Sequence, residues 1–223
     1  MSESQPLRSL VLASRKGGAG KTTLALHLGV LLSTRCKVLL IDADEQASAS
    51  AWFRMRAADE PRLVACQPRQ VREVLAMAAT EGVELAVVDT AGKAEVENMM
   101  RLADFVLIPV RTAFLDLDAV ARTVQSVHEL GKPGAIVLNS APSPRGAGEA
   151  SLTNAARIAL TAYRLPVAPT AIVNRTIIST SLASGEVATE QEPHGKAARE
   201  MRLLADYVEK ALWHAHPALA LTS

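Results

Sequence analysis

A glycine-rich segment at residues 15–23 lies between two apolar runs, and it constrains the fold more than any other stretch of the chain. The run before it, residues 10–13, is typical of a buried strand, and the run after it, residues 24–28, is typical of a helix. Three glycines let the backbone turn tightly with its N–H groups pointing inward, beside the positive end of the new helix. The segment therefore predicts a phosphate-binding loop within an α/β fold, and a turn that binds no ligand is the alternative.

The loop also contains the side chains that phosphate binding needs. Lys21 is placed to reach the β- and γ-phosphates of a nucleotide, and the Thr22 hydroxyl is placed to hold Mg²⁺. The predicted nucleotide-binding residues of the loop are Lys16, Gly17, Gly18, Ala19, Gly20, Lys21, Thr22 and Thr23.

The loop departs from the ordinary G-x-x-x-x-G-K-[ST] pattern, because Arg15 stands where that pattern has glycine and a second lysine, Lys16, precedes the glycine pair. Residues 16–22, Lys-Gly-Gly-Ala-Gly-Lys-Thr, resemble the deviant Walker A motif of the ParA/MinD family of dimeric ATPases. The pattern is similar to that of small ParA-type partition proteins (ParF-like) and VirC1-like proteins. The resemblance implies that Lys16 reaches the partner's nucleotide across a dimer interface and acts in catalysis with Lys21. Without it, Lys16 is a solvated loop lysine.

Three aspartates stand where predicted strands end, and in open α/β sheets ligands bind at the carboxyl ends of strands. Asp42 and Asp44 follow the apolar run 38–41, and Asp89 closes the run 85–88 as a Walker B aspartate does. Residues 42–46 resemble the family's D-x-D-P-Q segment, with Glu45 in place of proline and the restraint on φ lost. The alternative is a helix-capping aspartate followed by acidic first-turn residues.

The resemblance assigns a role to each aspartate. It implies that Asp42 supports the Mg²⁺ shell and that Asp44, a catalytic residue, orients the attacking water. Asp89 is expected to hold the metal or water opposite the phosphate loop. The predicted metal-site residues are thus Thr22, Asp42 and Asp89.

Length and composition favour one domain, residues 1–223, although two small ones are not excluded by length. Apolar residues make up 49% and aromatic residues 3%, which suits parallel strands buried on both faces. We therefore expect a doubly wound, mostly parallel twisted sheet with helices on both faces, the architecture of P-loop NTPases. The first predicted strand begins within ten residues of Met1, so no N-terminal helix-turn-helix domain is expected.

Other stretches carry weaker expectations. A final strand is predicted at residues 167–173, and the polar stretch 185–195 is predicted as a surface loop. His27, within the first predicted helix, is expected to pack or face solvent rather than bind a ligand. Asn139 ends a predicted strand, and Pro169 begins a turn at 169–172. The family resemblance implies that both contact the adenine ring, although asparagine is common in turns anyway.

Charge and cysteine content limit the function classes. The formal net charge is +1, so a nucleic-acid surface would have to be a local cluster. The two cysteines, Cys36 and Cys66, are isolated, which fits a reducing compartment and offers no disulfide framework or metal-ligand pair. We see neither a signal peptide nor a membrane span, and therefore expect a cytoplasmic protein.

The resemblance implies an ATP-dependent switch. ATP with Mg²⁺ binds between two subunits and assembles a homodimer, hydrolysis loosens it, and turnover stays slow until a partner completes the site. Members of the partition type work with a ParB-like adaptor and bind DNA without sequence preference, which implies association with the nucleoid. Candidate phosphate contacts are Arg145, Arg157, Arg164, Arg175, Lys196, Arg199 and Arg202.

Other function classes remain as alternatives. A MinD-like membrane-cycling ATPase would end in a basic amphipathic helix, but residues 212–219 lack lysine and contain Pro217, so membrane binding is not expected. A metal-cluster carrier would need more cysteines. A small-molecule kinase or ligase would leave Lys16 without a task. A VirC1-like role in DNA transfer, or positioning of another protein complex, stays open.

Overall fold

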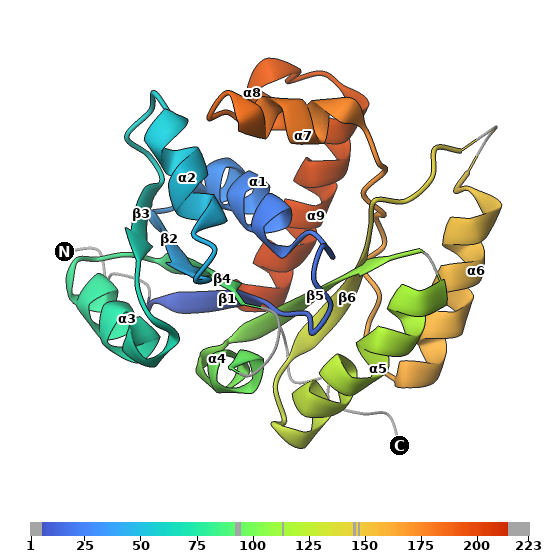
Figure 1. The fold of residues 1–223 in the computed structure, drawn as a ribbon, viewed down its shortest axis with the longest axis horizontal. Helices are drawn as coiled ribbons and strands as arrows, with labels where there is room; N and C mark the ends of the chain where they lie inside the picture. Colours follow the sequence, from blue (N-terminus) through green and yellow to red (C-terminus); the bar gives the residue numbers. More distant parts are fainter. Residues whose placement is uncertain (1–5, 92–94, 113, 145, 147, 214–223) are drawn as a thin grey trace.

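The chain folds around a parallel sheet in a computed structural model that describes residues 6–91, 95–112, 114–144, 146 and 148–213, without the side chains of 114–119. Within this part of the chain the sheet has six strands, all parallel, in the order β3-β2-β4-β1-β5-β6 (Figure 1). The strands are β1 (Arg8–Leu12), β2 (Val38–Ala43), β3 (Arg62–Ala65), β4 (Leu85–Thr90), β5 (Phe105–Arg111) and β6 (Gly134–Asn139).

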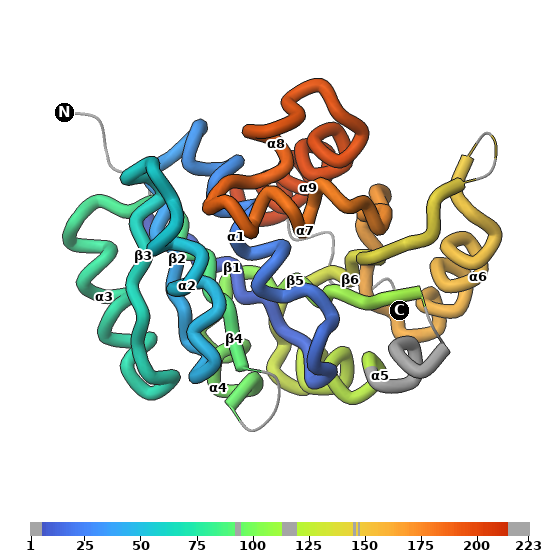
Figure 2. The backbone as a smooth tube through the Cα atoms, turned by 45° about the horizontal axis from the view of Figure 1, so that its top comes forward, coloured from blue at the N-terminus to red at the C-terminus, as the bar shows by residue number. Residues whose placement is uncertain are grey.

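Two helical layers cover the sheet (Figure 1). On one face lie α1 (Lys21–Ser33), α2 (Ser48–Met55), α7 (Thr176–Ala183), α8 (Ala188–Gln191) and α9 (Lys196–Trp213). On the other lie α3 (Val71–Thr80), α4 (Val96–Leu102), α5 (Phe114–Glu129) and α6 (Ser151–Leu160). Figure 2 shows the α7–α9 segment beside α1. The doubly wound prediction is confirmed.

Strand composition explains the two cores. Alternate side chains of a strand point to opposite faces of the sheet. In β1, Leu10 and Leu12 pack into the core under α1 and α9, whereas Val11 packs into the core under α3 and α4. All three are at most 1% exposed. The continuous apolar runs of β1, β4 and β5 therefore reflect burial on both faces, as expected for a parallel sheet.

The strand order reverses at β1. The chain runs outward from β1 through β2 to β3, returns to β4 next to β1, and then continues outward through β5 to β6. Because all strands are parallel, their carboxyl ends share one edge of the sheet. A crevice at such a reversal is the usual ligand site of this architecture.

The strand predicted at residues 167–173 is wrong. This segment forms only isolated parallel bridges, from Val167 to Ile136 of β6 and from Val173 to Ala141 just after β6. Its backbone bonds β6 through Ala168 and Ile172, and the run is broken at Pro169, which has no N–H to donate. The segment lies along the β6 edge without becoming a seventh strand.

The surface loop predicted at residues 185–195 is also wrong in part. This stretch contains the short helix α8, and Val187 and Ala188 are fully buried against α1. The polar composition of the stretch hid two small apolar residues that close the core.

No helix in the described ranges has both the length and the hydropathy that crossing a bilayer requires.

Candidate functional site

The phosphate loop joins β1 to α1 and has the backbone geometry that its glycines predict. Gly18 and Gly20 adopt left-handed φ angles of 72° and 99°, and Gly20 is the N-cap of α1. A Cβ at Gly20 would lie 2.0 Å from Nδ2 of Asn139, so this position requires glycine for space as well as for φ.

Asn139 contacts the phosphate loop through its side-chain amide. It lies at the end of β6, is 5% exposed, and its Nδ2 donates to the carbonyl of Ala19 at 2.8 Å. The structure thus gives its amide nitrogen a partner within the phosphate loop. Pro169 lies elsewhere, exposed beside Arg157, whose Nη2 donates to its carbonyl at 3.1 Å. Asn139 is thus buried and Pro169 exposed, and contact of either residue with an adenine ring stays a prediction.

A cavity of about 690 Å³ opens over the loop. Its described lining residues are Arg15, Gly17, Gly18, Gly20, Lys21, Thr22, Thr23, Asp44, Glu45, Gln46, Ser48, Pro68, Ala91 and Glu95. The cavity thus brings together the phosphate loop, the turn after β2 and the turn after β4. A volume of this size is in the range of pockets for small ligands and cofactors.

The three basic residues of the loop have different surroundings. Lys21, in the first turn of α1, is 8% exposed, whereas Lys16 is exposed. Arg15 pairs with Glu97 of α4 and also donates from Nη2 to Ser126 of α5 at 3.3 Å. The sequence flagged Arg15 only as a departure from a motif, and its role as an anchor between the loop and two helices was missed.

Asp89, near the end of β4, is a buried carboxylate with no hydrogen bond from the described residues. It is 2% exposed, and neither carboxylate oxygen has a hydrogen-bond partner among the described residues. Burial raises the pKa of Asp89 to about 7. The nearby Thr22 hydroxyl and Lys21 ammonium counter this effect in part, although neither meets the geometry of a hydrogen bond to Asp89.

Asp42 is the Cα partner of Asp89 in the β2–β4 ladder and is buried to the same extent. Its carboxylate is nevertheless well bonded. Oδ2 accepts from the Ser50 backbone N at 2.8 Å and from the Ser50 hydroxyl at 2.6 Å, and Oδ1 accepts from the Asp44 backbone N at 3.3 Å. Asp42 thus anchors the turn after β2 to the first turn of α2.

The turn between Asp42 and Ser50 presents carboxylates to the cavity. Asp44 is half-buried, and its Oδ1 accepts from the backbone N of Gln46 at 2.9 Å. Glu45 is exposed and lines the cavity beside it. Negative charge on this side of the cavity faces the basic phosphate loop on the other.

Asp89 and Thr22 fit a magnesium ion held jointly with a nucleotide. Mg²⁺ prefers oxygen ligands and is commonly bound by one or two protein groups plus substrate phosphates. The unpartnered carboxylate of Asp89 is such a ligand, since a buried charge normally has a partner. No three His, Cys, Asp or Glu side chains cluster as a metal site in the described ranges, so phosphate oxygens would have to complete the shell.

The candidate DNA contacts come from separate elements. Arg157 of α6 pairs with Glu149 at 2.6 Å, and Arg175 pairs with Glu200 at 2.7 Å, so both guanidinium groups have acidic partners within the chain. Two further candidates, Lys196 and Arg199, are exposed in the first turn of α9. Arg145 lies outside the described residues.

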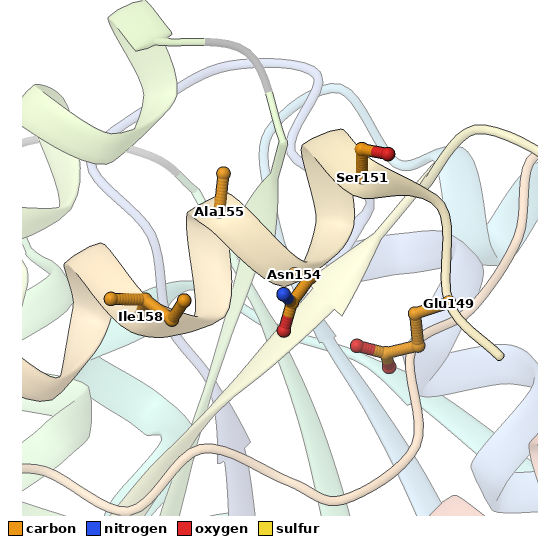
Figure 3. Close-up of a pocket in the computed structure, with 5 residues that line it drawn as sticks. All are labelled: Glu149, Ser151, Asn154, Ala155 and Ile158. Carbon is orange, nitrogen blue, oxygen red and sulfur yellow. The ribbon is translucent and has the colours of Figure 1, made fainter.

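A second pocket, of about 500 Å³, lies on α6 and is lined by Glu149, Ser151, Asn154, Ala155 and Ile158. Figure 3 shows that on α6 the Ser151 and Ala155 side chains point away from Asn154, and that Glu149 lies on the segment before the helix. Its polar groups do not converge on one space. The cavity over the phosphate loop, where glycines and charged groups surround a single space, is therefore the candidate site.

Comparison with known proteins agrees with this geometry. Residues 10–188 match the model of the CobQ/CobB/MinD/ParA nucleotide binding domain. The maintenance of carboxysome distribution protein A of Gloeobacter kilaueensis is 34% identical over 158 residues, covering 64% of this chain and 67% of the relative. Its counterpart from Halothiobacillus neapolitanus is 27% identical over 204 residues, covering 86% and 91%.

A solved structure has the same fold. The septum site-determining protein MinD of Pyrococcus horikoshii, complexed with Mg-ADP, superposes with a TM-score of 0.76 at 18% identity and covers 95% of this chain and 99% of its own. Because the family model matches most of the chain, and the phosphate loop and Asp44 line one cavity, the chain belongs to the CobQ/CobB/MinD/ParA family of nucleotide-binding proteins.

Proposed function

We propose that this chain is a positioning ATPase that hydrolyses Mg²⁺-bound ATP slowly and dimerises when ATP is bound. The observation that carries the proposal is the unpartnered, buried carboxylate of Asp89 beside Thr22 and Lys21 of the phosphate loop. Such a carboxylate is unfavourable in the nucleotide-free protein and becomes favourable with a cation opposite it.

The chain's own groups divide the work of hydrolysis. The N–H groups of the loop and the Lys21 ammonium bind and orient the phosphates. Thr22 and Asp89 hold the metal, which when bound neutralises charge on the β- and γ-phosphates. Asp44, which reaches the cavity from the turn after β2, orients the attacking water. Asp42 holds the turn after β2 in place, because its Oδ2 accepts both hydrogen bonds from Ser50.

Lys16 makes the difference between a simple ATPase and a dimerising switch. It is exposed, between the cavity-lining residues Arg15 and Gly17, and its side chain is long and flexible enough to reach a second subunit. Loss of the γ-phosphate removes the contact that holds the two subunits, so the dimer population falls after hydrolysis.

Light scattering after size exclusion, with and without ATP and Mg²⁺, tests this proposal. We expect the natural chain to dimerise with ATP, Lys16→Ala to bind ATP as a monomer, and Lys21→Ala to lose ATP binding. Lys210→Ala, which changes an exposed lysine of α9, is the matched control and should behave as the natural chain. If Lys16→Ala dimerised at the same ATP concentration as the natural chain, the role assigned to Lys16 would be contradicted.

The cargo is proposed to be DNA, segregated together with a ParB-like DNA-binding adaptor. In the ATP dimer, exposed basic residues such as Lys196 and Arg199 contact DNA phosphates without reading sequence. Retention on DNA should then require ATP and weaken steeply between about 50 and 200 mM salt. ATP-dependent retention that ignores salt would exclude this mode.

A second candidate is the positioning of a protein assembly or a DNA-transfer complex. The two relatives named as carboxysome distribution proteins favour this candidate, because their sequences match most of this chain at 34% and 27% identity. An adaptor that binds the ATP dimer but carries no DNA-binding activity would favour this candidate over partition. Binding to anionic vesicles is not expected in either case.

A further inference from the structure

His27 is a fully buried histidine of α1 that the proposed hydrolysis does not use. Its Nδ1 lies 2.8 Å from the carbonyl of Thr23, in the first turn of α1 next to the metal-binding Thr22. On the other side of the ring, Nε2 lies 3.2 Å from the backbone N of Ala188 and accepts its hydrogen. One ring therefore joins the phosphate-binding turn to the start of α8.

The two partners fix the state of the ring. The Ala188 N–H belongs to the first turn of a helix and has no partner within that helix, so it needs an acceptor. A neutral imidazole with hydrogen on Nδ1 donates to Thr23 and accepts from Ala188 at the same time. Burial lowers the pKa of His27 to about 4, although the Thr23 carbonyl and Glu190 oppose this shift. The neutral form is thus the one present near neutral pH.

The same segment of chain is fixed to α2 on its other side. The Arg56 guanidinium forms two hydrogen bonds to Glu190, of 2.8 and 3.0 Å, and donates to the carbonyl of Gly185 at 3.2 Å. The Arg56 side chain is only 4% exposed and lies 5.0 Å from the ring centre of Trp52. The Trp52 indole N–H donates to the carbonyl of Glu186 at 3.2 Å.

Residues 185–191, which we call the brace, therefore join two helices that each begin at the candidate site. Helix α1 begins with Lys21 and Thr22, and the first turn of α2 holds Asp42 through Ser50. We propose that the brace sets the position of the phosphate-binding turn relative to the turn that contains Asp44, with His27 and Arg56 as positioning residues. This inference rests on the proposed ATPase activity.

A pair of substitutions at His27 tests the brace. His27→Leu removes the acceptor for Ala188 in a side chain of similar bulk, whereas the Gln side chain of His27→Gln keeps an acceptor oxygen. Because small displacements of catalytic groups reduce turnover strongly, we expect kcat to fall about 10-fold in His27→Leu, with KM for ATP within about 2-fold. His27→Gln should recover to within about 3-fold of the natural chain.

Two further variants keep the test interpretable. His128→Leu makes the same chemical change at an exposed histidine of α5 and should leave both constants unchanged. Arg56→Lys retains charge but cannot form the paired bonds to Glu190, and it serves if His27→Leu does not fold. The brace proposal would be overturned if His27→Leu turned over ATP as fast as the natural chain, or if the Leu and Gln variants were equally impaired. If His27→Leu does not fold, turnover by Arg56→Lys as fast as that of the natural chain would overturn it.

Amide hydrogen exchange separates failure of the brace from failure of the ATPase proposal. In the nucleotide-free protein, His27→Leu, or Arg56→Lys in its place, should speed exchange of the Ala188 and Ser50 amides, since loosening one end of the brace loosens the other. If the natural chain binds no ATP, the ATPase proposal fails while this measurement still judges the brace. Unchanged exchange at Ser50 would reject the coupling.

Discussion

Asp42 and Asp89 are neighbours in the β2–β4 ladder, equally buried, and yet they have opposite surroundings. Asp42 accepts three hydrogen bonds, two of them from Ser50 in the first turn of α2. Asp89 accepts none from the described residues, and its pKa is raised to about 7. The same residue type at the same depth accepts three hydrogen bonds in one strand and, among the described residues, none in the next.

The contrast between Asp42 and Asp89 shows where the fold retains an energetically unfavourable buried carboxylate. A rise in pKa from 3.8 to about 7 corresponds to roughly 4 kcal/mol between the charged and neutral forms of Asp89. A buried carboxylate left without donors is expected at a site that binds a cation, since functional sites often reduce stability.

Removing the charge of Asp89 should give the largest effect. In Asp89→Asn we expect Mg²⁺-dependent ATP hydrolysis to fall by roughly 10³-fold, because the ion loses its protein carboxylate. Steady-state phosphate release with Mg²⁺ titration measures this loss. Turnover within 10-fold of the natural chain would mean that Asp89 is not the metal ligand.

The stability of the nucleotide-free protein should depend on pH through the same residue. The folded pKa of Asp89 lies above its unfolded value of 3.8, so its contribution is fully present below pH 3.8 and is lost as pH rises to about 7. We expect Asp89 to lower the free energy of unfolding by up to about 4 kcal/mol across this window. Urea unfolding at several pH values measures it.

Asp89→Asn is the control for this pH dependence. The amide cannot ionise, so the decline attributed to Asp89 should disappear, and the variant should be more stable than the natural chain at pH 8. An unchanged pH profile in the variant would assign the titration to another group.

Replacing Asp42 should lower the stability of the protein, the opposite of the effect expected for Asp89→Asn at pH 8. Asp42→Ala leaves the Ser50 N–H and hydroxyl and the Asp44 N–H without their acceptor, and we expect it to destabilise the protein by about 3 kcal/mol. Urea unfolding at pH 8 measures the loss, and Asp42→Asn, which keeps an acceptor oxygen, should restore part of it. If Asp42→Ala were as stable as the natural chain, the contrast with Asp89 would fail.

Ser50→Ala should give the smallest effect. It removes the hydroxyl donor to Asp42 but leaves the backbone N–H in place, so we expect a loss of about 1 kcal/mol. Ser179→Ala changes an exposed serine that bonds only its own helix, and thermal unfolding should place it within about 0.5 kcal/mol of the natural chain. Equal effects of the two variants would remove Ser50 from the anchor.

Much of the fold could be predicted because its signals are local. The buried strands are continuous aliphatic runs, and the phosphate loop and Asp89 follow them directly in the sequence. The prediction failed at residues 167–173, where Pro169 interrupts an otherwise strand-like run, and at residues 185–195, where polar neighbours hide the buried Val187 and Ala188.

The unpredicted parts of the site depend on contacts between distant residues. No local pattern pairs Ser50 with Asp42, Arg15 with Glu97, or His27 with Ala188, because each depends on how helices pack on the finished sheet. The sequence assigned Asp42 and Asp89 alike to the metal, and for both residues this role stays a prediction. The difference between them is visible only in the donors that surround each one.

The irregular segment beside β6 also has a consequence for solubility. It occupies the hydrogen-bonding edge of β6 at Ile136 and Leu138, and also bonds Ala141 just after β6, so that edge is not available to a strand from another molecule. At the opposite edge, β3 has only four residues and begins with the exposed Arg62. Short, charged or covered edges resist the strand-to-strand pairing that leads to aggregation. In the described part of the chain, neither edge of the sheet therefore offers a long free strand to a second copy of this protein.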